Sequence, residues 1–454
     1  MEKMTVKEAA VAIGSAPQID GIITEVCTDT RKICAGCLFI AIKGENFDGH
    51  DFAAAALEKG AVAVVVEKNC GLGKQQLIVK STRQALLDLA GYYRRKFHIP
   101  VVGITGSVGK TTTKDMTHFV LSSRFKTLKN EGNLNNEIGV PLTLFRLDSS
   151  YEAAVIEMGM SNFGEISRIT AAVKPSIAII TNIGVSHIEN LGSRENILKA
   201  KLEIIESMKP NANLILNGDD DLLSAYQDMT HPLIYFGIDS PVCNTKALDI
   251  ELGSDETSFT AEFAGGTQRV TLPMSGKHSI YDALAAISAG IVLGIEATDA
   301  AKALSGYVPS GMRQRIVRKG GITVIEDCYN ASPDSQRAAL EVLRGLDAKR
   351  RIAVLGDMKE LGSMSEQAHR EVGVAASNSD VDILVCCGDE AEFIADEGRK
   401  GGIKKVLHFK NKEDAAKYLI NTVKDGDALL FKASRAMKLE DIIQSLYDFL
   451  ERMS

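Results

Sequence analysis

Short apolar segments alternate with amphipathic helical patterns over most of this chain, and this alternation limits the fold more than any other feature. Between residues 101 and 310 the apolar segments include 101–104, 153–156, 177–180 and 214–216. Each is long enough for one buried strand, and helical patterns lie between them. Strands that are joined through helices form a parallel sheet with helices covering it. The sequence therefore predicts an α/β fold.

The length of 454 residues exceeds what one hydrophobic core usually organises, so we expect several domains. Residues 1–82 predict a small α/β domain. Residues 83–310 predict a central domain with a mainly parallel sheet, in which the polar, strand-like stretch 232–275 suggests an antiparallel extension. Residues 311–454 begin at a Pro/Gly breaker cluster and continue as another α/β series, which is typical of a Rossmann-like domain.

Charge and composition restrict the function classes. A net charge of -7 and a pI near 5.7 argue against a nucleic-acid binder, which needs a concentrated positive surface. The first residues contain no apolar signal core and the longest apolar runs are strand-sized, so we expect no membrane segment and a cytoplasmic location. We also expect a monomer. The eight cysteines are irregularly spaced, and we interpret the pair Cys34 and Cys37 as ordinary thiols.

A glycine-rich loop at 105–111 (TGSVGKT) follows a buried strand and precedes a helix. Its glycines allow backbone N–H groups to face a phosphate, Lys110 can reach the terminal phosphates, and the Thr111 hydroxyl can bind Mg²⁺. Ile104 stands where the standard motif has a glycine, which points to a tighter variant of the loop. The alternative is a glycine-rich turn with an exposed lysine, but the strand and helix on either side favour nucleotide binding.

Two further residues are expected at the same edge of the sheet. Glu157 ends the strand 153–156, and His187 follows the strand 177–180 and a short turn. Ligands gather at the carboxyl ends of parallel strands. A lone histidine is usually a surface or core residue, but beside Glu157 and Thr111 it is a candidate Mg²⁺ ligand.

The helical pattern 194–208 separates two lysines. Lys199 lies four residues from Glu195 and Glu203, on a face where charges pair in solvent. Lys201 shares the apolar stripe of Ile197 and Ile205, so its amine is expected inside. A buried, neutral amine can add CO₂ and become a carbamate, which is an oxygen ligand for a second Mg²⁺. The alternative is a lysine whose amine reaches back to the surface.

These motifs resemble those of the Mur ligases, and the likeness extends over nearly the whole chain. The matching runs are 105–113 (TGSVGKTTT), 133–139 (NLNNEIG), 157–160 (EMGM), 182–187 (NIGVSH), 199–201 (KAK), 327–335 (DCYNASPDS) and 355–362 (LGDMKELG). Within the family the runs 133–139, 327–335 and 355–362 resemble the member that joins D-alanyl-D-alanine to UDP-N-acetylmuramoyl-tripeptide. The resemblance implies an ATP-dependent ligase of peptidoglycan precursor synthesis.

The resemblance also implies a role for each of several residues. It makes Lys110, Glu157, His187 and Lys201 catalytic, and it gives two Mg²⁺ ions the ligands Thr111, Glu157, His187 and a carbamylated Lys201. It assigns ATP to Thr105, Gly106, Ser107, Gly109, Lys110, Thr111, Thr112, Asn136, Arg313, Asp327 and Asn330. It assigns the substrates to Thr28, Asp29, Thr30, Arg31, Lys43, Gly44, Asn135, Asp357 and Glu360, with residues 1–82 as the UDP-binding domain and 311–454 binding the incoming dipeptide.

The expected chemistry is an acyl phosphate, formed when the substrate carboxylate attacks the ATP γ-phosphate and then captured by the dipeptide amine. Closure of the third domain, with Arg313, would exclude water. The chain departs from the family at Ser279 and Asp282, near the expected adenine, and at Ala433 and Ala436, where the family has glycines.

Other functions remain open at this point. They are a sibling ligase that adds a single amino acid, a folate-type glutamate ligase, which lacks a UDP-binding module, and an ATP-binding protein without catalysis. The diamino-acid sibling carries an Asp-Asn-Pro-Arg motif that this sequence lacks. The retained catalytic set argues against a simple nucleotide binder. Ser434 and Arg435 are further candidates for ligand contact.

Overall fold

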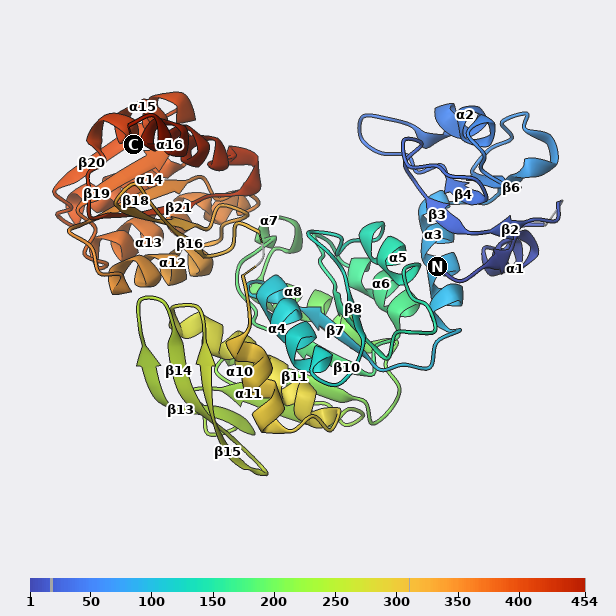
Figure 1. Cartoon of the computed structure of the whole chain (residues 1–454), viewed down its shortest axis with the longest axis horizontal. Coiled ribbons are helices and arrows are strands. Elements are labelled where there is room, and N and C mark those ends of the chain that lie inside the picture. Colours follow the sequence, from blue (N-terminus) through green and yellow to red (C-terminus); the bar gives the residue numbers. More distant parts are fainter. Residues whose placement is uncertain (17–18, 310, 454) are drawn as a thin grey trace.

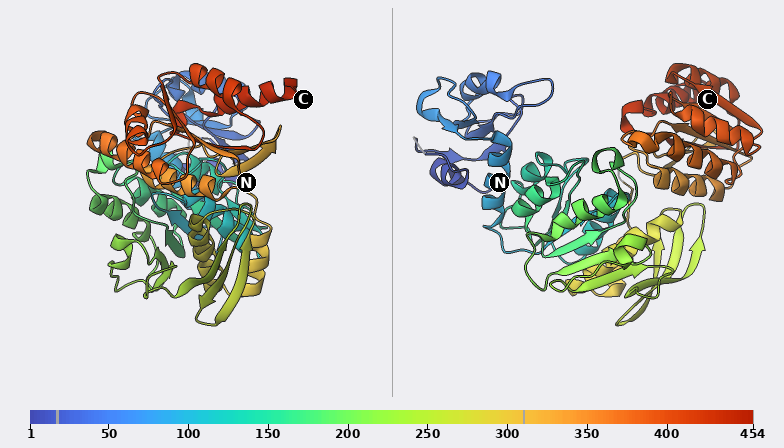
Figure 2. Two further views of the ribbon diagram at one scale, coloured as in Figure 1. Left: turned by 90° about the vertical axis from the view of Figure 1, so that its left-hand side faces the viewer. Right: turned by 180° about the vertical axis from the view of Figure 1, so that it is seen from behind.

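The computed structural model describes residues 1–16, 19–309 and 311–453, with no side-chain description at 453. In this part of the chain the strands form sheets of two, four, nine and six members. Figure 1 shows the four-stranded sheet at one end (blue), the six-stranded sheet at the other (orange to red), and the nine-stranded sheet between them. The view from behind in Figure 2 gives the same arrangement.

The N-terminal part carries the two small sheets. Strands β3 to β6 are parallel in sequence order, and β1 pairs with β2 antiparallel. Its strands are β1 (Met4–Thr5), β2 (Ile22–Ile23), β3 (Glu25–Cys27), β4 (Cys37–Ile40), β5 (Ala63–Val66) and β6 (Gln76–Ile78), and its helices are α1 (Val6–Ala12), α2 (Ala53–Glu58) and α3 (Thr82–Arg94). Helix α3 packs on α1 and on two helices of the central part, so it joins the two.

The central sheet has the order β15-β14-β13-β12-β11-β10-β7-β9-β8. Its strands are β7 (Val101–Thr105), β8 (Thr127–Lys129), β9 (Ala153–Glu157), β10 (Ile177–Ile180), β11 (Asn213–Asn217), β12 (Leu233–Gly237), β13 (Thr245–Leu252), β14 (Thr257–Phe263) and β15 (Gly266–Leu272). The chain runs from β7 to one side through β8 and β9 and then crosses to β10, so the order reverses at β7. Such a switch point opens a crevice at the carboxyl ends of the strands.

Helices cover both faces of this sheet. One face holds α4, α10 and α11 over an apolar cluster that includes Met116, Val120 and Ile287, and the other holds α5, α6 and α8. The helices are α4 (Lys110–Ser122), α5 (Gly139–Leu144), α6 (Glu165–Val173), α7 (Ile188–Leu191), α8 (Arg194–Leu202), α9 (Asp221–Ser224), α10 (Lys277–Val292) and α11 (Ala297–Ser305). The antiparallel extension expected at 232–275 is confirmed for β13 to β15, but it is wrong for β12, which pairs parallel with both neighbours.

The C-terminal sheet has the order β16-β17-β21-β18-β19-β20, and all its pairs are parallel except β16 with β17. Its strands are β16 (Arg315–Lys319), β17 (Ile322–Glu326), β18 (Arg350–Gly356), β19 (Ile383–Cys387), β20 (Lys405–Phe409) and β21 (Asp427–Lys432). Its helices are α12 (Pro333–Gly345), α13 (Ser365–Ser377), α14 (Ala391–Lys400), α15 (Lys412–Thr422) and α16 (Glu440–Met453).

The α/β class predicted from the alternation is confirmed. The domain boundaries expected at 82 and 310 stay predictions, and residue 310 itself lies outside the described residues. Among the described helices, none has both the length and the apolar character that crossing a bilayer requires.

Candidate functional site

The glycine-rich loop lies between β7 and α4, as predicted. Gly106 has a φ of 148°, and a side-chain carbon there would come 1.9 Å from the Thr181 hydroxyl. Gly109 has a φ of 86°, and a side chain would come 2.7 Å from Asp282 Oδ1. Neither position accommodates a larger residue, because the backbone conformation and the space both exclude a side chain. The turn is therefore specified by its two glycines.

The loop is held by the segment that follows β10. Ser107 N donates to Asn182 O at 3.0 Å, Val108 N donates to Asn182 Oδ1 at 2.9 Å, and Gly184 N donates to Ser107 Oγ at 2.9 Å. Lys110 Nζ donates to the carbonyls of Gly106 and Ser107 at 2.8 and 3.1 Å. Its ammonium therefore bends over the loop, where a terminal phosphate of a nucleotide would lie.

Burial and two charged neighbours change the pKa of Lys110. Burial lowers the pKa of Lys110, the negative charge of Glu157 opposes this shift, and the positive charge of Arg313 adds to it. Arg313 comes from the C-terminal part of the chain, two residues before β16. A lysine and an arginine from separate parts thus lie near enough to repel each other, and an anion between them would relieve that repulsion.

Glu157 is the last residue of β9 and is 1% exposed. Its Oε2 accepts a hydrogen bond from Thr111 Oγ1 at 2.8 Å, and its Oε1 accepts one from Asn135 Nδ2 at 2.8 Å. Asn130 holds its backbone on both sides, at 2.9 and 3.1 Å. The hydroxyl of the phosphate loop and the carboxylate of the neighbouring strand are therefore adjacent, as the sequence predicts.

Lys201 lies inside and Lys199 outside, as the periodicity of α8 predicts. Lys201 is 2% exposed and makes no hydrogen bond or ion pair with any described residue. Burial, with a contribution from the positive Lys110, lowers the pKa of Lys201 well below its ordinary value. Burial therefore favours the neutral form of this amine, which is the nucleophilic form that reacts with CO₂.

His187 directly precedes the short helix α7 as its N-cap residue and has a φ of 63°. Its Nδ1 is 2.5 Å from Glu360 Oε2, although the direction is not that of a regular hydrogen bond, and this contact lowers the pKa of Glu360. Glu360 also has a positive φ, of 66°, and its carbonyl accepts from Glu189 N at 3.4 Å. The loop after β18 is thus docked on the central part beside the site.

A cavity of about 710 Å³ lies between the central and C-terminal parts. It brings together many of the predicted site residues: Ser107, Gly109, Lys110, Thr111, Thr112, Asn135, Asn136, Glu157, His187, Arg313, Asp327, Asn330 and Glu360. Thr105, Gly106 and Lys201 do not line it. The Asn136 side chain caps α5 by accepting from Gly139 N at 2.9 Å.

Several lining residues escaped the sequence reasoning, including Lys432, Tyr329 and Gln314. Lys432, at the end of β21, places Nζ 2.6 Å from Asp327 Oδ2 and 3.3 Å from the Asn330 carbonyl. Tyr329 stacks on the Arg313 guanidinium, with 3.8 Å between the guanidinium carbon and the ring centroid. Gln314 N donates to Asp327 Oδ1 at 3.3 Å. A lysine that ends a buried strand was the available signal for Lys432.

The remaining predicted substrate residues lie away from this cavity. In the N-terminal part, Asp29 and Arg31 form a two-point ion pair at 2.9 and 2.8 Å in the loop 28–31 after β3. Lys43 bridges to Asp48 across the turn that contains Gly44. In the C-terminal part, the buried Asp357 carboxylate accepts from Ala391 N at 2.8 Å and so caps α14. Contacts of all these residues with substrate stay predictions.

The structure shows the surroundings of three of the four departures from the family pattern. Ser279 Oγ donates to the Gly276 carbonyl at 2.7 Å within α10, and Asp282 Oδ1 accepts from Thr113 Oγ1 at 2.5 Å. Burial raises the pKa of Asp282 to about 7. Ala433 is buried, and a side chain on Gly356 would come 2.8 Å from its Cβ.

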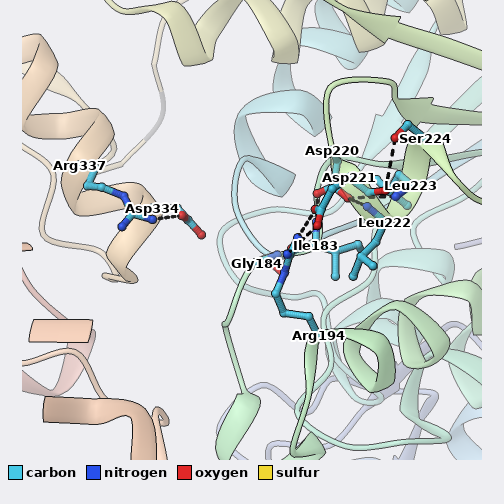
Figure 3. Close-up of polar contacts among 11 residues, drawn as sticks. Ile183, Gly184, Arg194, Asp220, Asp221, Leu222, Leu223, Ser224, Asp334 and Arg337 are labelled. Atoms are coloured by element: carbon cyan, nitrogen blue, oxygen red, sulfur yellow. Dashed lines mark hydrogen bonds and ion pairs between the residues drawn. The ribbon is translucent and has the colours of Figure 1, made fainter. Parts of the chain in front are cut away.

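A second cavity, of about 530 Å³, adjoins the loop 182–185 (Figure 3). On one side Arg194 donates to the Ile183 carbonyl at 2.8 Å and pairs with Asp221 at 2.5 Å, while Asp220 Oδ2 accepts from Ile183 N at 2.7 Å. On the other side lies Arg337 of α12, paired with its own neighbour on that helix. These contacts fix the segment that in turn holds the phosphate loop.

Magnesium fits this geometry as an ion bound by few protein ligands. Among the described residues, no three histidine, cysteine or carboxylate side chains come together in a way that could hold a metal by themselves. Mg²⁺ does not require such a cage, because it binds one or two carboxylates together with waters and substrate phosphates. The buried Glu157 carboxylate beside the Thr111 hydroxyl supplies oxygen donors of this kind.

Comparisons with known proteins agree along the chain. Family models match residues 22–101 (Mur ligase family, catalytic domain), 104–290 (Mur ligase middle domain) and 312–435 (Mur ligase, glutamate ligase domain). The chain is 40% identical over 459 residues to a UDP-N-acetylmuramoyl-tripeptide--D-alanyl-D-alanine ligase of Bacillus subtilis, covering 99% of both chains. It is 35% identical over 441 residues to the ligase of that name in Escherichia coli, covering 96% of both.

Solved structures give the same result. A crystal structure of MurF from Acinetobacter baumannii superposes with a TM-score of 0.92 at 32% identity and 99% coverage of both chains. A MurF ligase from Thermotoga maritima in complex with ADP superposes with a TM-score of 0.87 at 30% identity, covering 95% of this chain and 98% of that one. Sequence and fold therefore place the chain in the Mur ligase family.

Proposed function

We propose that the chain is an ATP-dependent ligase that joins D-alanyl-D-alanine to UDP-N-acetylmuramoyl-tripeptide in peptidoglycan precursor synthesis. The observation that carries the proposal is the Glu157 carboxylate, which accepts from Thr111 at the phosphate loop, inside a cavity shared by two parts of the chain. Relatives at 35% to 40% identity over nearly the whole chain carry the name of this ligase. A cytoplasmic location and a monomeric state stay predictions.

The chain's own residues suggest how the first step proceeds. Lys110 would neutralise the charge that develops on the γ-phosphate while the tripeptide carboxylate attacks it. Thr111, Glu157 and His187 would hold Mg²⁺, whose charge supports the transferring phosphate. Lys201, as a carbamate, would provide the ligand for a second ion. The product of this step is an acyl phosphate and ADP.

The C-terminal part would complete the reaction. Arg313 and Asp327 come from the C-terminal part and line the same cavity as the phosphate loop, so closure of that part would bring them over ATP. The dipeptide amine then attacks the acyl carbon, forms the amide bond and expels phosphate. Water would destroy the intermediate, so closure around both substrates protects it.

Phosphate release tests this proposal. Purified protein with ATP and UDP-N-acetylmuramoyl-tripeptide should release phosphate at an appreciable rate only when D-alanyl-D-alanine is added. Release that depends on a single amino acid instead would indicate a sibling ligase, and nucleotide binding without release would indicate a non-catalytic protein. Parallel assays with diaminopimelate or lysine as the third peptide residue would define the natural tripeptide.

A further inference from the structure

Lys114 is a buried lysine of the phosphate-loop helix that the proposed mechanism does not use. It lies three and four residues after Thr111 and Lys110, so α4 turns all three to one side. Its side chain is 2% exposed. Its Nζ is 3.4 Å from Asp115 Oδ1 and 3.9 Å from Glu157 Oε2. The ammonium therefore lies between two buried carboxylates.

Ion pairs join two carboxylates and two lysines in this cluster. Asp115 and Glu157 supply two negative charges, and Lys114 and Lys129 supply two positive ones, with Lys129 Nζ 2.6 Å from Asp115 Oδ1. Burying a charge without a partner costs several kcal/mol, so the interior requires such compensation. Among the described residues, Lys114 is the cation that lies within ion-pair distance of Glu157.

The Lys114 ammonium lies closer to Asp115 than to Glu157. At 3.9 Å from Glu157 the ammonium balances the charge without a direct hydrogen bond, and at 3.4 Å it lies nearer to Asp115. The direct hydrogen bonds to the Glu157 carboxylate come from the neutral groups of Thr111 and Asn135. Lys114 can therefore give up Glu157 and keep Asp115 as its partner without leaving the interior.

We propose that Lys114 is a built-in countercharge for Glu157, which balances this carboxylate when no magnesium is bound and competes with magnesium for it. The inference rests on the proposed function, in which Glu157 is a magnesium ligand. Lys114 stabilises the site when no Mg²⁺ is bound. It also weakens the affinity of the site for Mg²⁺, so that the ion can bind and dissociate together with the nucleotide.

The test is Lys114→Met in the full-length protein. Removing a positive charge beside the ligand should strengthen Mg²⁺ binding about tenfold or more, since two charges several ångströms apart interact by a few kcal/mol at a protein-like dielectric. The unfolding temperature without the ion should fall, and its rise on adding MgCl₂ should be larger than in the wild type. Thermal unfolding measured across MgCl₂ concentrations, at ionic strength held constant with KCl, gives both quantities. Unchanged or weaker Mg²⁺ binding would overturn the proposal.

Two further variants separate charge from packing. Lys129→Met removes a positive charge that contacts Asp115 and is partly exposed, so its Mg²⁺ affinity should change much less than that of Lys114→Met. The double variant Lys114→Met with Asp115→Asn restores the charge balance, and its Mg²⁺ affinity should return to near the wild-type value. It also keeps the test available if the single variant does not fold. Equal tightening in Lys129→Met and Lys114→Met would contradict the local pairing.

A Glu157→Gln variant distinguishes this inference from the proposed function. If Glu157 is a magnesium ligand, the variant loses the Mg²⁺-dependent stabilisation. Loss in Glu157→Gln without tightening in Lys114→Met would leave the proposed function intact and refute the countercharge. A wild-type Mg²⁺ response in Glu157→Gln would refute the proposed metal site, and the countercharge with it.

Discussion

Replacing Lys201 by methionine should abolish ligation and leave the fold intact or stabler. A bound metal ion stabilises transition-state charge by several kcal/mol, and each 1.4 kcal/mol or so changes the rate about tenfold. Loss of its ligand should therefore lower the ligation rate about a thousandfold. Lys201 is buried and has no hydrogen-bond or ion-pair partner among the residues that the structure describes, and burial lowers its pKa well below 10.5. Each unit of such a shift costs about 1.4 kcal/mol of stability at pH 7, which methionine avoids.

The lowered pKa of Lys201 also determines how the stability difference between the variant and the wild type changes with pH. The unfolded lysine binds a proton that the folded one releases, so the penalty in the wild type is large at neutral pH and falls as the pH approaches 10.5. In buffer freed of CO₂, the stability advantage of Lys201→Met should therefore be larger at pH 7 than at pH 10.

Lys199→Met is the matched control, because Lys199 is exposed on the same helix. Ligation rates and urea unfolding should be measured for both variants. Lys199→Met should be nearly silent in both measurements. Equal losses of activity in the two variants, or full activity in Lys201→Met, would refute the assignment of the two faces.

Three other changes test neighbouring parts of the structure. Burial raises the pKa of Asp282 to about 7, so its charged form destabilises the fold, and Asp282→Asn should stabilise the protein by up to about 4 kcal/mol above pH 7 and have no effect below pH 4. A gain in stability that is the same at both pH values in urea unfolding would contradict this. Arg350→Met should lower the free energy of unfolding by about 3 kcal/mol, since it leaves the buried Asp427 carboxylate without its arginine. A decrease below about 1 kcal/mol would show that this ion pair contributes little to stability. Arg313→Ala should lower the rate of phosphate release at least about a hundredfold with an unchanged unfolding midpoint, and a wild-type rate would remove this residue from the site.

Local patterns were sufficient for much of the fold and part of the site. The alternation of apolar and helical segments predicted the parallel sheets, because each strand and helix is specified by its own residues. The glycines themselves signalled the turn around Gly106 and Gly109, although distant residues hold it, and the separation of Lys199 from Lys201 follows from the helical period of α8. Glu157 could be placed because strand ends in a parallel sheet share one edge.

Other features depend on contacts between distant segments, which no local pattern contains. The contact of His187 with Glu360 joins two loops that are far apart in sequence. The burial of Lys114 could not be foreseen, since a lysine on a helix with polar neighbours normally faces solvent. The segment of β12 was misjudged because it was grouped with the polar, strand-like residues that follow it, whereas antiparallel pairing begins only between β13 and β14.

The most direct test of the account follows one oxygen atom. UDP-N-acetylmuramoyl-tripeptide carrying heavy oxygen in its terminal carboxylate is incubated with ATP, Mg²⁺ and D-alanyl-D-alanine, and the released phosphate is examined by mass spectrometry. If the carboxylate attacks the γ-phosphate, one labelled oxygen passes into the phosphate with each amide bond formed. Unlabelled phosphate alongside normal product would contradict an acyl phosphate and, with it, the proposed role of the phosphate loop.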